Sequence, residues 1–222
     1  MRFLRVGPAG SERPAVLDTD GLAYDLTSLT ADIDGAFLAG DGVERAREAL
    51  AGGALPRIDI SGQRTGAPVA RPGKVVCIGL NYADHAEETA TPPPAEPVIF
   101  MKASNTVVGP DDTVLIPRTS TRTDYEIELA VVIGRTARYL DSPAAAADVV
   151  AGYAIADDVS ERSFQIERGG QWDKGKSCET FNPLGPWLVT PDETGDPQEL
   201  ALRLWVNGEP RQHGHTKNMI FG

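Results

Sequence analysis

Short runs of apolar residues, broken by Gly, Pro and polar positions, recur along most of the chain. Runs of about four to eight such residues are typical of strands. Near the start, residues 15–17 and 22–24 flank a Gly-containing turn at residues 18–21, which predicts a β-hairpin. Further strands are predicted at residues 75–80, 98–102, 113–116, 126–133, 152–156, 187–190 and 202–207.

Helical spacing is rarer. Val43, Ala46 and Leu50 share one face of a predicted helix that Asp41 could cap. Ser142 could cap a second helix, in the alanine-rich stretch that follows it. Many strands and few helices predict an α+β fold that is mixed and dominated by β-sheet.

A stretch rich in Gly, Pro, Arg and Ser, residues 54–73, has weak periodicity and indicates a linker. It predicts a small N-terminal domain, linker included, at residues 1–70. A larger domain is then predicted at residues 71–222. The strand at residues 75–80 is expected to be buried, and the strand at residues 126–133 is expected to enter a core on both sides.

The charge balance limits the possible partners. The chain has 32 Asp and Glu against 21 Lys and Arg, a formal charge of -11, so neither nucleic acid nor an anionic membrane is an expected partner. An anionic substrate would need a local cation, and a bound metal would supply it. The two cysteines give no disulfide framework and no zinc spacing. Because no apolar run is long enough for a bilayer or a signal peptide, a cytoplasmic protein is expected.

Two carboxylates open the strand at residues 126–133. Alternate side chains of a strand share a face, so Glu126 and Glu128 project together. Two carboxylates at the mouth of a buried strand repel each other, and a shared cation would remove that repulsion. The alternative is a strand end with two solvated glutamates.

A second acidic pair ends the next strand, at Asp157 and Asp158. Two glutamates and an aspartate make an all-oxygen site, which suits magnesium, manganese or calcium. Alternatively, Asp157 or Asp158 caps a helix.

Two further segments offer catalytic groups. On a predicted short polar helix at residues 81–89, His85 and Glu88 share one face, so the carboxylate could orient the imidazole as a general base. Such a pair is also common on exposed helices. Lys176 lies in a Gly-rich loop and could stabilise an oxyanion, although a solvated surface loop is the plainer interpretation. His213 and His215, in a predicted polar loop, are expected at the surface.

Several ordered motifs together resemble the fumarylacetoacetate hydrolase family, from about residue 74 to the end. They lie at residues 76–85, 96–102, 124–129, 152–162, 175–177 and 219–221. The resemblance implies a C-terminal-domain-like fold of several β-sheet layers, a homodimer, and bound Mg²⁺ or Mn²⁺. It assigns Glu126, Glu128 and Asp158 as metal ligands, His85 and Glu88 as a water-activating dyad, Lys176 as the active-site lysine, and Arg162 and Gln165 as residues near the substrate.

The resemblance also implies a reaction. A metal-dependent hydrolase would cleave a C–C bond in a 2,4-dioxo acid and release pyruvate, with His85 and Glu88 activating water and Lys176 stabilising the oxyanion. Residues 167–178 resemble the branch that acts on 2,4-dioxo-3-deoxy sugar acids. The alternatives are an oxaloacetate decarboxylase, a dienoate isomerase or hydratase, and a catalytically silent metal-binding protein.

Family members continue past the motif at residues 219–221 through a helix and several strands. We therefore expect either that this chain is part of a longer product or that a partner chain covers the open sheet.

Overall fold

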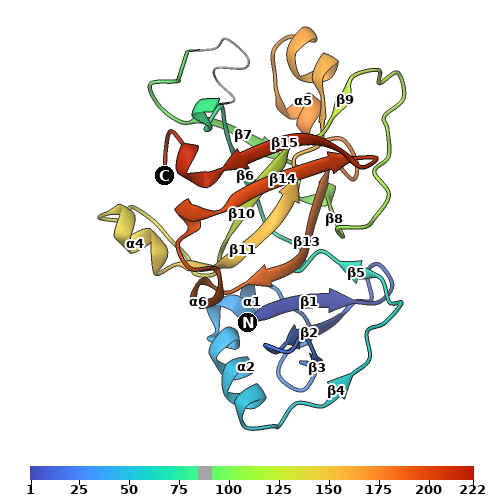
Figure 1. The fold of residues 1–222 in the computed structure, drawn as a ribbon, viewed down its shortest axis with the longest axis vertical. Coiled ribbons are helices and arrows are strands. Elements are labelled where there is room, and N and C mark those ends of the chain that lie inside the picture. Colours follow the sequence, from blue (N-terminus) through green and yellow to red (C-terminus); the bar gives the residue numbers. More distant parts are fainter. Residues whose placement is uncertain (85–91) are drawn as a thin grey trace.

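The computed structural model describes residues 1–84 and 92–222, and strands dominate it (Figure 1). The strands are β1 (Arg2–Val6), β2 (Arg13–Leu17), β3 (Ala23–Asp25), β4 (Arg57–Ile58), β5 (Thr65–Gly66), β6 (Val75–Gly79), β7 (Val98–Lys102), β8 (Val107–Val108), β9 (Thr123–Asp124), β10 (Ile127–Ile133), β11 (Val150–Asp157), β12 (Ser160–Glu161), β13 (Asn182–Val189), β14 (Ala201–Val206) and β15 (Glu209–His215). The helices are α1 (Gly35–Ala39), α2 (Gly42–Ala51), α4 (Pro143–Ala147), α5 (Asp173–Lys176) and α6 (Pro191–Thr194), with a π-helical turn at Ser163–Glu167. The α+β, sheet-dominated fold class is thus confirmed.

One large sheet joins strands of the first 70 residues to strands from the later part of the chain. Its strand order is β10-β11-β13-β1-β2-β3-β4, with β5 also paired to β1 and β8 paired to β13. Strand β1 pairs antiparallel with β13, with Arg2 opposite Val189. Backbone hydrogen bonds therefore link residues 1–70 directly to the later part of the chain, and the division into two domains stays a prediction.

The main core is built mostly from residues of the first 70 positions, and it also includes Leu188 of β13. Phe3 of β1, Phe37 of α1 and Leu188 of β13 are almost fully buried in one cluster. The rings of Phe3 and Phe37 pack edge to face with centroids 5.7 Å apart. Val132 of β10 and Ala151 of β11 pack against the same cluster, so the core spans the predicted boundary.

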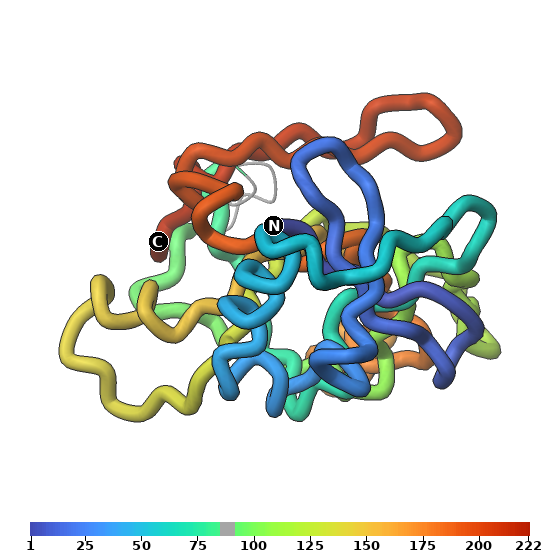
Figure 2. Tube along the Cα trace, turned by 90° about the horizontal axis from the view of Figure 1, so that it is seen from below, coloured from blue at the N-terminus to red at the C-terminus, as the bar shows by residue number. Residues whose placement is uncertain are grey.

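Smaller two-stranded sheets complete the fold. β6 pairs with β7, β9 with β12, and β14 with β15, all antiparallel. Helix α4 and its flanking segments project from one side of the molecule, and the turn between β14 and β15 projects from the opposite side (Figures 1 and 2). Among the described helices, none is long and apolar enough to cross a membrane.

Several local predictions are confirmed. β2 and β3 form the hairpin. Helix α2 buries Ala46 and packs Val43 and Leu50 against the core. Ser142 caps α4 by accepting a hydrogen bond from the amide of Ala145. Asp41 does precede α2, but its side chain makes no capping bond and instead accepts one from Arg135 at 3.1 Å, so that part of the prediction is wrong.

Other local predictions are wrong. Residues 113–116 form no strand, and the amide of Leu115 donates to the Thr180 hydroxyl. The predicted polar loop around His213 and His215 is strand β15, although His213 is exposed as expected.

Two strands are less buried than expected. Val76 of β6 is 54% exposed, because among the described strands β6 pairs with β7 alone and presents one face to solvent. In β10, Val131 and Ile133 are about half exposed and the other five residues are only partly buried, so neither face of this strand is fully covered.

Candidate active site

A cavity of about 2020 Å³ opens between β6, β10 and the segments that precede and follow them. Its lining includes six of the eight residues proposed as functional from the sequence: Glu126, Glu128, Asp158, Arg162, Gln165 and Lys176. The other two, His85 and Glu88, lie outside the residues that the structure describes. The structure therefore brings the proposed metal ligands together with the proposed lysine.

Pairing between β10 and β11 brings the carboxylates together. Glu126 stands just before β10, and its amide donates to Oδ1 of Asp157 at 3.0 Å. The amide of Asp158 in turn donates to the carbonyl of Glu126 at 2.9 Å. These two bonds close the mouth of the strand pair, so the Glu126 and Asp158 side chains meet at one place. Neither aspartate caps a described helix.

Lys176 lies at the end of α5, not on a solvated loop, and is 2% exposed. Its Nζ is 2.5 Å from Oε2 of Glu126 and 2.6 Å from Oδ2 of Asp158. The ring of Phe100 lies 5.0 Å from the same nitrogen, in cation–π geometry.

Gly175 allows this helix to approach so closely. A Cβ at position 175 would lie 2.5 Å from the Glu161 carbonyl and 2.6 Å from the Gln165 amide. A side chain there would push α5 away, so the absent side chain of Gly175 positions Lys176.

A second buried cation, Lys102, was missed from the sequence. It ends β7, and its Nζ lies 2.5 Å from Oδ1 of Asp158 and 3.1 Å from the carbonyl of Val159. Burial lowers the pKa of Lys102, despite the neighbouring Asp158 charge. Burial would raise the pKa of Asp158, but the charges of Lys176 and Lys102 outweigh it and hold that pKa below its usual value. A cation at the end of an apolar strand was the available signal.

Arg162 completes the positive side of the cluster. Its guanidinium donates to Oε1 of Glu126 at 2.5 Å, to Oδ2 of Asp124 at 2.9 Å and to Oε1 of Gln165 at 3.1 Å. The short strand β12 and the π-helical turn place Arg162 and Gln165 beside the carboxylates. Asp124, which aligns Arg162, was also missed.

Glu128 has less compensation, because the charge of Lys176 only partly offsets the effects that raise its pKa. Burial, together with the charges of Glu126 and Asp158, raises the pKa of Glu128 to about 8. Its carboxylate has no hydrogen bond or ion pair with residues 1–84 or 92–222. Within those ranges no three His, Cys, Asp or Glu side chains form a ready-made metal site, and the Lys176 ammonium stands between Glu126 and Asp158.

The chemistry of the three carboxylates nevertheless suits a hard divalent cation. All the donor atoms are oxygens, and the carboxylates of Glu126 and Asp158 already share one cation, Lys176. A divalent ion would also relieve the repulsion that raises the pKa of Glu128. The donor set of Glu126, Glu128 and Asp158 thus fits Mg²⁺ or Mn²⁺.

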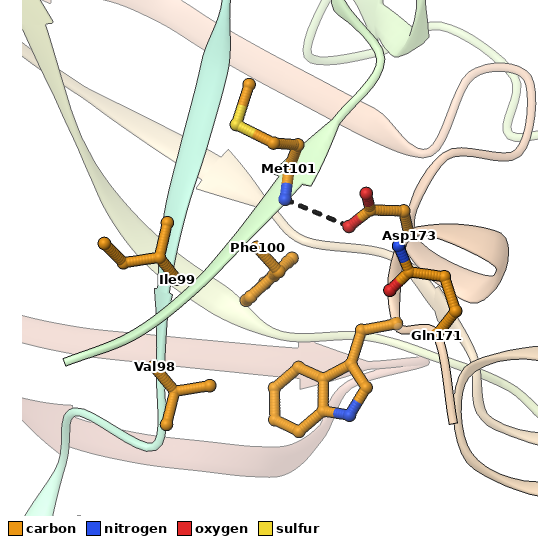
Figure 3. Close-up of a pocket in the computed structure, with 7 residues that line it drawn as sticks. Val98, Ile99, Phe100, Met101, Gln171 and Asp173 are labelled. Carbon is orange, nitrogen blue, oxygen red and sulfur yellow. Dashed lines mark hydrogen bonds between the residues drawn. The ribbon is translucent and has the colours of Figure 1, made fainter. Parts of the chain in front are cut away.

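A side pocket of about 300 Å³ adjoins the cavity (Figure 3). The rings of Phe100 and Trp172 form part of it, 5.5 Å apart, and both residues also line the main cavity. Asp173 fastens α5 to β7, because its Oδ1 accepts a hydrogen bond from the Met101 amide at 3.1 Å (Figure 3). This attachment, unforeseen from the sequence, fixes the helix that carries Lys176.

Comparison with known proteins agrees with this architecture. Residues 74–222 match the family model described as the C-terminal domain of fumarylacetoacetate (FAA) hydrolase. A protein of Burkholderia lata, provisionally named a hydrolase, is 50% identical over all 222 residues, which span 77% of its length.

Solved structures with this fold have different named activities. A maleylpyruvate hydrolase from Sphingobium sp. SYK-6, in complex with manganese and pyruvate, superposes with a TM-score of 0.79 and 28% identity, over 99% of this chain and 78% of that one. A 5-carboxymethyl-2-hydroxymuconate delta-isomerase from Mycobacterium smegmatis superposes with a TM-score of 0.74 and 33% identity, over 99% and 76%. The shared fold thus carries both hydrolases and isomerases.

Proposed function

Because the chain belongs to the fumarylacetoacetate hydrolase family, we propose that it hydrolyses a C–C bond in a 2,4-dioxo acid and releases pyruvate. The substrate is an acylpyruvate or a 2,4-dioxo-3-deoxy sugar acid, and the cofactor is Mg²⁺ or Mn²⁺. One observation carries the proposal: Lys176 is buried between Glu126 and Asp158, in a cavity that Glu128 also lines.

The cations explain how an acidic protein could bind an anionic substrate. Lys102, Arg162 and Lys176 gather around the carboxylates, although the chain has a net charge of -11. A divalent ion bound by the carboxylates would polarise the 2-oxo acid. Lys176, held by α5 beside the same carboxylates, is then the group that stabilises negative charge developing on a substrate oxygen.

Activation of water is assigned to His85, oriented by Glu88. This assignment rests on the family resemblance of residues 76–85 and on their spacing along the sequence. The manganese and pyruvate in the related maleylpyruvate hydrolase support the choice of metal and product class.

The direct test is release of pyruvate. Protein treated with a chelator is assayed against a series of acylpyruvates and a 2,4-dioxo-3-deoxy sugar acid, with Mg²⁺ or Mn²⁺ restored, and pyruvate is measured through lactate dehydrogenase. We expect metal-dependent turnover by the wild type and by the control Lys217→Met, whose side chain is exposed. Lys176→Met should lose about a hundredfold or more. If no such substrate yields pyruvate with either metal, the proposal is wrong.

A second candidate is isomerisation of a dienoic 2-oxo acid, which the related isomerase favours. That reaction changes ultraviolet absorbance without releasing pyruvate, so the same samples distinguish it. Oxaloacetate decarboxylation, a third candidate, releases pyruvate from oxaloacetate but not from acylpyruvates. A silent metal-binding protein would bind manganese and turn over none of these compounds.

A further inference from the structure

Tyr82 has an unusual hydroxyl. The oxygen is buried and has no hydrogen-bond partner among the residues that the structure describes. A buried polar atom without a partner is unfavourable, and native proteins contain few of them. Tyr82 lines the same cavity as Glu126, Glu128 and Asp158, so the unused hydroxyl belongs to the candidate active site.

The backbone around Tyr82 is held firmly. Tyr82 forms an isolated antiparallel bridge with Met219. The Asn81 side chain bonds both ways to the backbone of Phe221: its Nδ2 donates to the carbonyl at 3.0 Å, and its Oδ1 accepts from the amide at 2.8 Å. Asn218 donates to Oδ2 of Asp84 at 2.9 Å. These contacts make a clamp on both sides of Tyr82, so the direction of its side chain is maintained by the fold.

Leu80 provides an independent sign of strain in the backbone that leads to Tyr82. Its φ is +54°, in the left-handed region, which a leucine rarely adopts. Such strain concentrates at ligand-binding positions, where surrounding contacts maintain it. Here it lies two residues before Tyr82, where the chain leaves β6, and the clamp at residues 81–84 maintains it.

The hydroxyl is a donor under ordinary conditions. Burial, and then the negative charges of Glu128 and Asp84, raise the pKa of the Tyr82 phenol above its usual value. The phenol therefore keeps its proton and can donate one hydrogen bond. An oxygen of a bound ligand is the acceptor that would satisfy it.

We propose that the Tyr82 hydroxyl donates a hydrogen bond to an oxygen of the 2-oxo acid bound beside Glu126, Glu128 and Asp158. This inference rests on the proposed function. Tyr82 is thus a substrate-binding residue, whose hydroxyl the described residues leave unpaired so that the ligand satisfies it.

The test compares Tyr82→Phe with Tyr24→Phe. The control tyrosine lies in β3, outside the lining of the cavity, and its hydroxyl donates to Oδ2 of Asp18 at 3.1 Å. For each protein, calorimetry measures manganese binding, and then binding of oxalate, a 2-oxo acid mimic, in the presence of manganese. Thermal unfolding without either ligand gives the midpoint.

Tyr82→Phe should bind manganese as the wild type does but oxalate about tenfold more weakly. Its unfolding midpoint should be equal or higher, because an unpaired buried hydroxyl is gone. Tyr24→Phe should bind oxalate normally. If Tyr82→Phe binds oxalate as tightly as the wild type, this inference is wrong but the proposed function stands. A lowered unfolding midpoint would also overturn this inference, because it would reveal a hydrogen-bond partner of the hydroxyl inside the protein. If the wild type binds no oxalate with manganese, the proposed function fails and the inference with it.

Discussion

The ammonium nitrogen of Lys176 lies 2.6 Å from Oδ2 of Asp158, and both residues are buried. An ion pair with so little water depends strongly on both partners, because removing one leaves an uncompensated charge. Lys176 is therefore a structural counter-charge as well as the proposed catalytic cation.

The first prediction concerns this counter-charge. In a chelating buffer, Lys176→Met should destabilise the protein by about 3 kcal/mol, because Glu126 and Asp158 lose their shared cation. Manganese should restore part of that stability, so the rise in unfolding midpoint on adding manganese should be larger for the variant than for the wild type. An equal rise in both proteins would contradict the shared-cation interpretation. Chemical unfolding followed by circular dichroism measures the effect.

The second prediction concerns the metal ligands. Glu126→Gln should bind manganese at least about tenfold more weakly, since it removes one negative charge from the donor set. Calorimetric titration measures the affinity. Glu44→Gln is the control, because Glu44 lies on α2 with its side chain 62% exposed, and it should bind normally. Unchanged affinity in Glu126→Gln would remove Glu126 from the site.

The third prediction is a pH dependence. Burial and two neighbouring carboxylates raise the pKa of Glu128 from 4.5 to about 8. Below the lower value the carboxyl is protonated in both folded and unfolded chains. Between the two values the unfolded chain loses this proton while the folded protein keeps it, so the contribution of this group to stability falls as pH rises.

Urea unfolding in chelating buffer, from about pH 5 to about pH 8, tests this effect. Glu128→Gln cannot ionise and should lose less stability over that range than the wild type does. Parallel curves for the two proteins would show that Glu128 does not titrate in this way.

The fourth prediction separates water activation from metal binding. His85→Ala should bind manganese normally and lose about 10²–10⁴-fold in hydrolysis. Oxaloacetate decarboxylation, if present, should fall less, because it needs no activated water. Equal losses in both reactions would give His85 another role.

The fifth prediction tests the close approach of α5. Gly175→Ala should lower both turnover and the unfolding midpoint, because the new Cβ would lie 2.5 Å from the Glu161 carbonyl. Gly73→Ala has open space around its Cβ and should change neither. Normal turnover in Gly175→Ala would mean that α5 can shift without moving Lys176 out of place.

Much of the site was predictable from local patterns. The sequence alone indicates a carboxylate cluster, because Glu126 and Glu128 alternate along one strand and two aspartates end the next strand. Pairing of β10 with β11 then brings these strand ends together. What local sequence could not provide is the partner of each charge: Lys102 reaches Asp158 across 56 positions.

The errors in the fold have a similar cause. Strand β15 contains Pro210 and Gly214 and few apolar residues, so its own sequence favours a loop. It is a strand because Asn207 and Gly208, both with positive φ, form the tight turn that returns it onto β14. Residues 113–116 are the opposite case. Their composition suits a strand, but none of the described strands pairs with them.

The pairing of β1 with β13 also matters while the chain is being made. Residues 2–6 leave the ribosome early, yet their partner lies near residue 189. At a synthesis rate of about 5–20 residues per second, that partner follows roughly 10–40 s later. During this interval β1 can pair with β2 and β5, but its Arg2–Phe3 end still lacks β13, and Phe3 still lacks Leu188 as a core neighbour. Until β13 arrives, this end of β1 is an unpaired strand edge, which can pair with another chain.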